Sequence, residues 1–243
     1  MKQAILQIHD LSAIRSATFK LIVPNFSFKA GSVTCVAGPN GSGKSTLLAC
    51  MAGLLQPDTG KITLDGQTIG NHLRATKAVL GYIPDDEAWF VGELTANEYF
   101  GLLAEVCRQA GVTHDTIARA KVLASKLQFT TFNQQLQQLS HGNKKKVQLI
   151  AGLMHQPKVI IIDELRNGLD PLAIIAAEQL IKDEAKRGAC IVAATHDVWW
   201  AERIATTILL LLNGRIAVAD TPRAIIRKHG SVENLFIKTV RAA

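Results

Sequence analysis

A glycine-rich segment in the first quarter of the chain has the composition and spacing of a phosphate-binding loop. Residues 38–45 fit the pattern G-x-x-x-x-G-K-[ST], and a threonine follows. Small residues let the backbone curl until successive N–H groups converge on phosphate oxygens, and a helix starting there adds further free N–H groups. The predicted phosphate-binding residues are Gly38, Pro39, Asn40, Gly41, Ser42, Gly43, Lys44, Ser45 and Thr46.

Two side chains of this loop are expected to act directly on a nucleotide. Lys44 would reach the β- and γ-phosphates, and the Ser45 hydroxyl would ligate Mg²⁺. The loop also has the required context, because the apolar segment 33–37 reads as a buried strand and a helical pattern follows. The apolar residues of that pattern are Leu47, Leu48, Met51, Leu54 and Leu55. An ordinary glycine turn would not explain this combination.

An acidic pair at the end of an apolar run is the second candidate group. Asp163 and Glu164 directly follow the run 159–162. A buried parallel strand delivers such residues to the edge of the sheet where α/β proteins hold ligands. Asp163 suits Mg²⁺, directly or through water, and Glu164, pointing the other way along the pleat, suits an attacking water. A solvated acidic strand end would look the same, but the phosphate loop upstream favours the catalytic interpretation.

The composition indicates a folded protein without membrane spans. Of 243 residues, 48% are apolar and 19% charged, and the mean hydropathy of +0.16 favours a thoroughly buried parallel sheet. No apolar run approaches the roughly 18 residues of a membrane-spanning helix, and no secretory signal is visible, so we expect a cytoplasmic location. The cysteines lack metal-ligand spacing. The net charge of +7 reads as a solvated surface, and no nucleic-acid partner is predicted.

The elements that must position these groups alternate between strands and helices. Apolar runs bounded by turn residues predict strands at 33–37, 61–64, 79–83, 159–162, 191–194 and 207–212. Asn213-Gly214 predicts a tight hairpin to 215–218. Asp170-Pro171 predicts the start of a helix that runs to about residue 187, and a last helix is expected at 222–228. This alternation favours a mainly parallel sheet with right-handed crossovers.

The middle of the chain has a helical pattern instead. The capping box from Thr95 to Glu98 predicts a helix whose apolar face includes Tyr99, Leu102, Leu103 and Val106. Asp115 is expected to open a second helix through Leu127. Gly142 is expected to start a third, with Val147, Ile150 and Leu153 on one face. We therefore predict a helical insertion between strands.

Read together, these residues resemble the ATP-binding subunits of ABC transporters over nearly the whole chain. Residues 139–143, Leu-Ser-His-Gly-Asn, stand where that family carries its Leu-Ser-Gly-Gly-Gln signature. Residues 167–170 resemble its D-loop, 195–197 its switch histidine and 82–85 its Q-loop. The order of five elements is far more specific than the phosphate loop alone.

The resemblance implies a P-loop NTPase core with a mainly parallel sheet, an antiparallel β portion and an inserted α-helical subdomain. We expect a single ABC ATPase domain over 1–243, with a core at about 1–84 and 157–228, a helical subdomain at about 85–156 and a C-terminal tail at 229–243. The cofactors implied are ATP and Mg²⁺. The implied catalytic residues are Lys44, Glu164 and His196. The implied metal ligands are Ser45, Asp163 and Asp85.

The resemblance also implies a head-to-tail dimer, homomeric or heteromeric. Ser140 and the backbone of Gly142, at a helix start, would present donors to a γ-phosphate held by a second ATPase subunit. The chain would energise a separate transmembrane permease at the inner face of the membrane, with residues 86–90 near the docking groove. Packing within the helical subdomain is the alternative role of Trp89 and Phe90. The residues of these motifs are closer to those of export-type, ABC-2-like subunits than to those of solute importers. The alternative is a soluble ABC ATPase acting in cofactor or complex assembly.

Several residues depart from the family pattern. His141 replaces a signature glycine, and Asp85 replaces the Q-loop glutamine, so it cannot donate as an amide does. Asn143 replaces the signature glutamine, and Leu165-Arg166 stands where proline and a small residue are usual. His141 could donate to a phosphate or face the seam. Arg166 could be a plain surface residue, or it could pair with an acidic neighbour or with the opposite subunit. Arg15 or Phe19 could stack on the adenine, and we expect Trp199 and Trp200 to pack beneath the switch loop.

Overall fold

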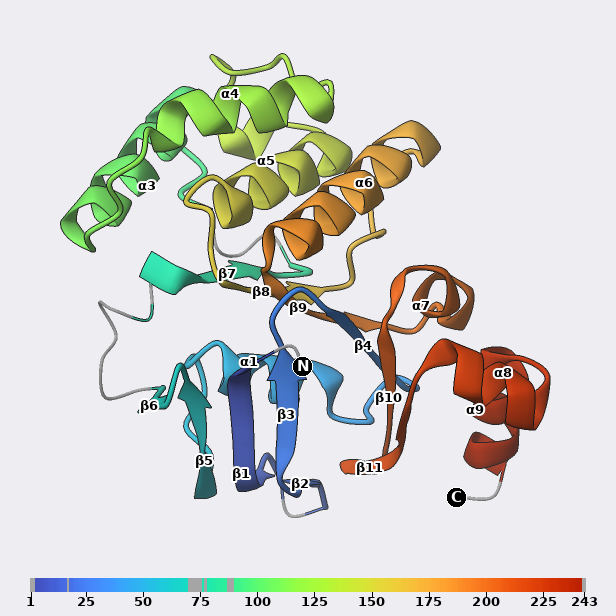
Figure 1. The fold of residues 1–243 in the computed structure, drawn as a ribbon. Helices are drawn as coiled ribbons and strands as arrows, with labels where there is room; N and C mark the ends of the chain where they lie inside the picture. Colours follow the sequence, from blue (N-terminus) through green and yellow to red (C-terminus); the bar gives the residue numbers. More distant parts are fainter. Residues whose placement is uncertain (1–2, 17, 70–75, 77, 87–89, 242–243) are drawn as a thin grey trace.

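The computed structural model describes residues 3–16, 18–69, 76, 78–86 and 90–241, which form a mixed sheet with helices on both faces (Figure 1). Strands run in the order β6-β5-β1-β2-β11-β10-β4-β9-β8-β7, and β3 pairs with β1. An α/β architecture with a mixed sheet confirms the predicted fold class. Within the described residues, no helix is both long and apolar enough to cross a bilayer.

The parallel part of the sheet places the candidate chemistry. It contains, in spatial order, β10 (Thr207–Leu212), β4 (Val33–Ala37), β9 (Cys190–Thr195), β8 (Val159–Asp163) and β7 (Leu80–Ile83). Each strand lies within two residues of its predicted bounds. Because these strands are parallel, the segments that follow them in the chain emerge at one edge of the sheet.

The antiparallel part is built around β1 (Ala4–Ile14), which pairs with β2 (Lys20–Val23), β3 (Phe26–Lys29) and β5 (Thr59–Leu64). Strand β6 (Gln67–Thr68) pairs antiparallel with β5, and β11 (Arg215–Asp220) pairs antiparallel with β10. Asn213 and Gly214 both have positive φ, as a tight hairpin turn requires, so the predicted hairpin is confirmed. The sequence analysis identified no strand at β1, β2 or β3.

The parallel strands are buried on both faces, and alternate residues enter two different hydrophobic clusters. Cys35, Ile160 and Ile162 point into a cluster that includes residues of most of the helices. Val36 and Ile161 point into a second cluster, with α1 (Lys44–Met51) and the antiparallel strands. The alternation follows from the period of two in a strand, and burial of both faces explains the uninterrupted apolar runs.

Three helices lie between β7 and β8 in the chain and pack on one another: α3 (Ala96–Gln109), α4 (Thr116–Lys126) and α5 (His141–Leu153). The capping box at Thr95 is present, and Asp115 and Ser140 cap α4 and α5. All three predicted helices are confirmed. Val147, Ile150 and Leu153 are buried as expected.

The predicted apolar face of α3 was partly wrong. Leu102 and Val106 are exposed, whereas Ala96 and Phe100 are the buried residues of this helix. Tyr99 and Leu103 pack at the margin of the core. Residues four apart on a helix share a face, so the true face, which carries Ala96 and Phe100 with Tyr99 and Leu103 beside them, is rotated toward Phe100 from the predicted one.

The described residues also form the helices α6 (Pro171–Arg187), α7 (Val198–Ile204), α8 (Pro222–His229) and α9 (Val232–Arg241). The bounds of α6 and α8 agree with prediction, whereas α7 and α9 were not predicted. Helix α9 lies in the stretch described from sequence as a tail, and it is anchored by the buried residues Val232 and Leu235. Helix α1 ends at Met51, and Leu54 beyond it is exposed, because Gly53 takes a left-handed conformation.

Buried carboxylates on α6 join this helix to its neighbours. Glu184 accepts hydrogen bonds from Arg119 of α4 and from Arg187, at 2.7 Å for the latter, and its side chain is 4% exposed. Glu178 pairs in the same way with Arg203 of α7. Removing one partner of such a pair leaves a charge buried without compensation.

We therefore expect Glu184→Gln to destabilise the protein by about 3 kcal/mol, because both arginines lose a carboxylate inside the fold. Urea unfolding followed by circular dichroism measures the change. Glu105→Gln is the matched control, since Glu105 also pairs with an arginine but lies on the exposed face of α3. Equal unfolding midpoints for the two variants would contradict this expectation.

Candidate nucleotide-binding site

The glycine-rich loop joins β4 to α1, and its glycines are sterically required. Gly43, the N-cap of α1, has φ 104° and provides no side chain to cap the helix. Gly41 has φ 79°. A Cβ on Gly38 would overlap the Leu211 carbonyl oxygen and the Ser42 hydroxyl. The loop therefore exposes backbone N–H groups and the positive end of a helix, which is the environment that anions favour.

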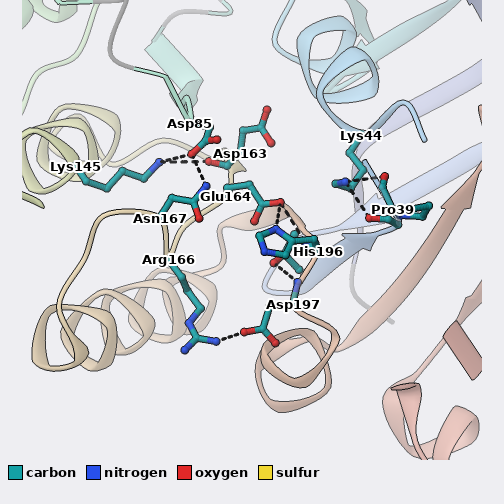
Figure 2. Close-up of polar contacts among 12 residues, drawn as sticks. Pro39, Lys44, Asp85, Lys145, Asp163, Glu164, Arg166, Asn167, His196 and Asp197 are labelled. Atoms are coloured by element: carbon teal, nitrogen blue, oxygen red, sulfur yellow. Dashed lines mark hydrogen bonds and ion pairs between the residues drawn. The ribbon is translucent and has the colours of Figure 1, made fainter. Parts of the chain in front are cut away.

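Lys44 is buried at the base of this loop and folds back on it (Figure 2). Its ammonium group donates to the carbonyl oxygens of Gly38, at 2.9 Å, and Pro39, at 3.1 Å. Burial lowers the pKa of Lys44, and the charges of Glu164 and Asp163 oppose that shift. The buried Ser42 hydroxyl has no hydrogen-bond partner among the described residues. The loop thus offers a cation and an unused polar group where a phosphate would lie.

The acidic pair lies across from the loop, at the end of β8. Asp163 is buried, which raises the pKa of its carboxyl, and a hydrogen bond from the Ser45 hydroxyl opposes this shift. The two residues predicted to share Mg²⁺ are therefore in contact. Together with Asp85 they line one cavity of about 1040 Å³. No group of three or more His, Cys, Asp and Glu side chains within the described ranges could hold a metal alone.

Glu164 adopts a backbone conformation that differs from the one predicted from the alternation of side chains along a strand. It lies beyond the last residue of β8 with φ 47°, the left-handed region that a non-glycine residue rarely enters. Its Oε1 accepts from the backbone N–H of His196 at 3.1 Å and lies 3.0 Å from that residue's Nδ1. The backbone turn, rather than strand alternation, sets the direction of the carboxylate, and the strain is of the kind found at functional sites.

The cavity also settles where the two candidates for adenine stacking lie. Arg15 and Phe19 both line it, together with the loop, the acidic pair and Tyr82. The Phe19 ring packs so closely over Gly43 that a Cβ there would be 2.8 Å from its Cζ. Either side chain can therefore face a base whose phosphates lie in the loop.

The signature residues lie away from this cavity. Ser140 accepts from the Asn143 backbone N–H at 3.3 Å as the N-cap of α5, and both Ser140 and His141 are exposed. Neither they nor Gly142 are among the described residues that line the cavity. The His141 ring packs against Gly168, where a Cβ would overlap it. His141 thus contacts its own chain, an arrangement that neither of the two readings of this residue had anticipated.

The switch region contains one confirmed and one incorrect expectation. Arg166 forms an ion pair with Asp197, the acidic neighbour that one of the two alternatives anticipated (Figure 2). Asp197 also caps α7. Trp200 is buried beneath this loop as expected, but Trp199 is 65% exposed, so its predicted packing was wrong. Adjacent residues in a helix point about 100° apart, and only one of the two can face the core.

Two residues near Asp85 were missed by the sequence analysis. The Asn167 side-chain amide donates to Asp85 Oδ1 at 2.9 Å, and the Lys145 ammonium lies 3.8 Å from the same oxygen. From the sequence, Asn167 was treated only as part of the D-loop, and Lys145 was assigned no role. The usable signal was the helical period, because Lys145 lies three residues after Gly142 and four before the buried Leu149, on the inner side of α5.

A phosphate loop facing an acidic pair across the edge of an α/β sheet defines a P-loop nucleotide-binding protein. The profile of the family described as ABC transporter matches residues 22–167. The chain belongs to the ABC transporter family.

Individual relatives agree with that assignment. Nod factor export ATP-binding protein I of Rhizobium sp. (strain N33) is 30% identical over 233 residues, covering 90% of this chain and 73% of that protein. Energy-coupling factor transporter ATP-binding protein EcfA of Methanococcus maripaludis is 28% identical over 249 residues, covering 99% and 87%. A solved ATP-binding subunit of an ABC transporter has a TM-score of 0.87 at 28% identity, covering 96% and 98%.

These findings confirm that the chain is an ATP-binding and ATP-hydrolysing subunit of the ABC transporter type, and they do not favour the alternative of a soluble assembly factor.

The position of Lys44 yields a direct test of the loop. We expect Lys44→Ala to weaken ATP binding by about tenfold to a hundredfold, because it removes the buried cation that would meet the phosphates. Titration with a fluorescent ATP analogue measures the affinity. Lys228→Ala is the control, since Lys228 pairs with Asp220 on the surface of α8. Full ATP affinity in Lys44→Ala would be evidence against the phosphate site.

Proposed function

We propose that this subunit hydrolyses Mg²⁺-bound ATP in a head-to-tail dimer of ATPase subunits and so energises a separate transmembrane permease. One observation carries the proposal. The cavity contains the phosphate loop, Asp163 and Glu164, whereas Ser140, His141 and Gly142 are outside its lining. The exposed start of α5 presents a helix N-terminus, whose positive dipole end suits a γ-phosphate. A second subunit can bring such a helix start to the open side of the site.

The residues at the end of β8 fit a magnesium ion bound together with the nucleotide. Mg²⁺ favours one or two carboxylates completed by hydroxyl, phosphate and water oxygens. Ser45 and Asp163 supply a hydroxyl and a carboxylate already in contact, and Asp85 lines the same cavity. When bound there, Mg²⁺ would supply positive charge that neutralises the charge of the phosphates.

The chain's own groups divide the remaining work. Lys44 binds the phosphates and, in doing so, leaves the carbonyl oxygens that it now contacts. Glu164 orients the attacking water and accepts its proton, since its carboxylate reaches the cavity from a fixed, strained backbone. His196 positions Glu164 through its backbone N–H and ring, and its exposed ring is available to a γ-phosphate.

A small groove supports permease docking. A second cavity, of about 170 Å³, lies where β7 meets α3 and α5, and it is lined by Tyr82, Pro84, Phe90, Tyr99, Gln148 and Ala151. Phe90 packs edge-on against Tyr99, with ring centroids 5.6 Å apart. Trp89, expected to act with Phe90, lies outside the described residues. We propose that a helix of the permease binds here, which holds the subunit at the inner face of the membrane. A relative named for Nod factor export supports the export-type reading of the motifs.

Glu164→Gln should separate binding from hydrolysis. The amide oxygen can still accept from the His196 N–H, so the fold and ATP affinity should be retained, but an amide is a poor proton acceptor. We expect turnover to fall by at least about a hundredfold. ATP-dependent dimers should accumulate, and size-exclusion chromatography with and without ATP measures them. Turnover equal to that of the unchanged protein would exclude Glu164 as the base.

Mixing two inactive variants tests the head-to-tail arrangement. Ser140→Arg should block the helix start while sparing ATP binding, and Lys44→Ala should block the phosphate loop while sparing the helix start. A mixed dimer then has one composite site with both halves intact. We expect phosphate release from the mixture to exceed that of either variant alone, with a Lys228→Ala plus Ser140→Arg mixture as the reference. No gain on mixing would contradict composite sites.

A further inference from the structure

A lysine outside the known motifs lies at the metal end of the site. Lys145 is on α5, and its side chain is 1% exposed. Its ammonium group donates to the carbonyl oxygen of Pro84 at 2.8 Å and to that of Asp163 at 3.4 Å (Figure 2). Those carbonyls belong to the end of β8 and to the residue that follows β7. One side chain from the helical insertion therefore connects two neighbouring strand ends of the sheet.

A charge buried this deeply requires compensation, and carboxylates supply it. Asp85 Oδ1 is 3.8 Å from the Lys145 ammonium. Asp163, Glu164 and Asp86 also act on this lysine through their charges. Burial lowers the pKa of Lys145, and these four carboxylates counter the shift. The hydrogen bonds to two carbonyls satisfy two of its three donors.

The carboxylates need Lys145 for the same reason. Asp85, Asp163 and Glu164 line one cavity. Burial and the charges of Asp85 and Glu164 raise the pKa of Asp163, whereas the charge of Lys145 opposes that shift. A neutral glutamine at position 85, the residue expected from the Q-loop resemblance, would add no charge. Asp85 adds one negative charge, and the Lys145 ammonium beside it adds one positive charge. The pair Asp85–Lys145 is thus close to neutral as a unit.

We propose that Lys145 is a positioning residue that acts as the fixed counterion of Asp85 and thereby sets the affinity of the nucleotide site for its divalent ion. This inference rests on the proposed binding of Mg²⁺ with ATP. The Asn167 amide, which donates to the same Asp85 oxygen, holds the carboxylate toward Lys145. Asp85 then contributes to the metal site as half of a neutral pair, in place of a free third carboxylate.

Neighbouring lysines on the same helix provide a comparison. Lys146 is only half-buried, and its charge acts on Asp170 at the start of α6. Lys146→Met therefore changes the net charge as Lys145→Met does, on the same helix, without touching Asp85. A difference in metal affinity between the two variants therefore reports the loss of the Asp85–Lys145 pair rather than the change in the net charge of the protein.

The test measures metal binding without hydrolysis. Mn²⁺ is titrated against the full chain with the non-hydrolysable β,γ-imido analogue of ATP, and free Mn²⁺ is followed by electron paramagnetic resonance. Lys145→Met exposes the metal to an uncompensated carboxylate, so we expect tighter Mn²⁺ binding, on the order of tenfold. Asp85→Asn leaves an unpaired ammonium, so we expect weaker binding, on the order of tenfold. The double variant Asp85→Asn/Lys145→Met should return to within about twofold of the original affinity.

The outcomes separate this inference from the proposed function. Opposite shifts that cancel in the double variant, with no shift in Lys146→Met, support the counterion. Equal affinities for Lys145→Met and Lys146→Met overturn it while Mn²⁺-nucleotide binding to the unchanged protein stands. Absence of that binding in the unchanged protein overturns the proposed function itself. If Lys145→Met does not fold, recovery of affinity in the double variant relative to Asp85→Asn decides the question.

Discussion

The shared carboxyl edge of the parallel strands is the constraint on which the site depends. Strands β4, β8 and β9 are neighbours in the sheet although they are far apart in the sequence, and each ends at a functional segment. The phosphate loop follows β4, Glu164 follows β8 and His196 follows β9. Because both faces of these strands are buried, their register cannot slip without moving apolar residues into the wrong cluster. The core thereby fixes the spacing of the polar groups.

Polar contacts above that edge turn proximity into orientation. The Glu164 carboxylate is held by His196, and Arg166 is held by Asp197, so the segments after β8 and β9 are tied together twice (Figure 2). Gly168 leaves room for His141, which places the start of α5 against the same segment. Each of these contacts joins two segments that are distant in the sequence, and a change in one segment therefore has few independent directions in which to relax.

The elements that were predicted correctly from the sequence are those determined by capping residues, turn residues or continuous apolar runs. The apolar runs of the parallel strands, the capping residues Thr95 and Asp170 and the hairpin at Asn213 were located within about two residues, near the usual error of element boundaries. Strands β1 to β3 were missed because polar residues interrupt their apolar ones, so that none of the three contains a long continuous apolar run. The left-handed turn at Glu164 and the partners of Lys145 depend on tertiary contacts across many residues, which no local pattern encodes.

Helix α5 links the two halves of the proposed dimer site. Its first turn carries Ser140, which faces outward, and the next residues carry Lys145, which faces the metal end of its own site. A helix is stiff over this short distance, so the ammonium anchored between the carbonyls of Pro84 and Asp163 also fixes where the exposed serine stands. The charge balance beside one nucleotide and the donor offered to the other are therefore set by the same rigid element.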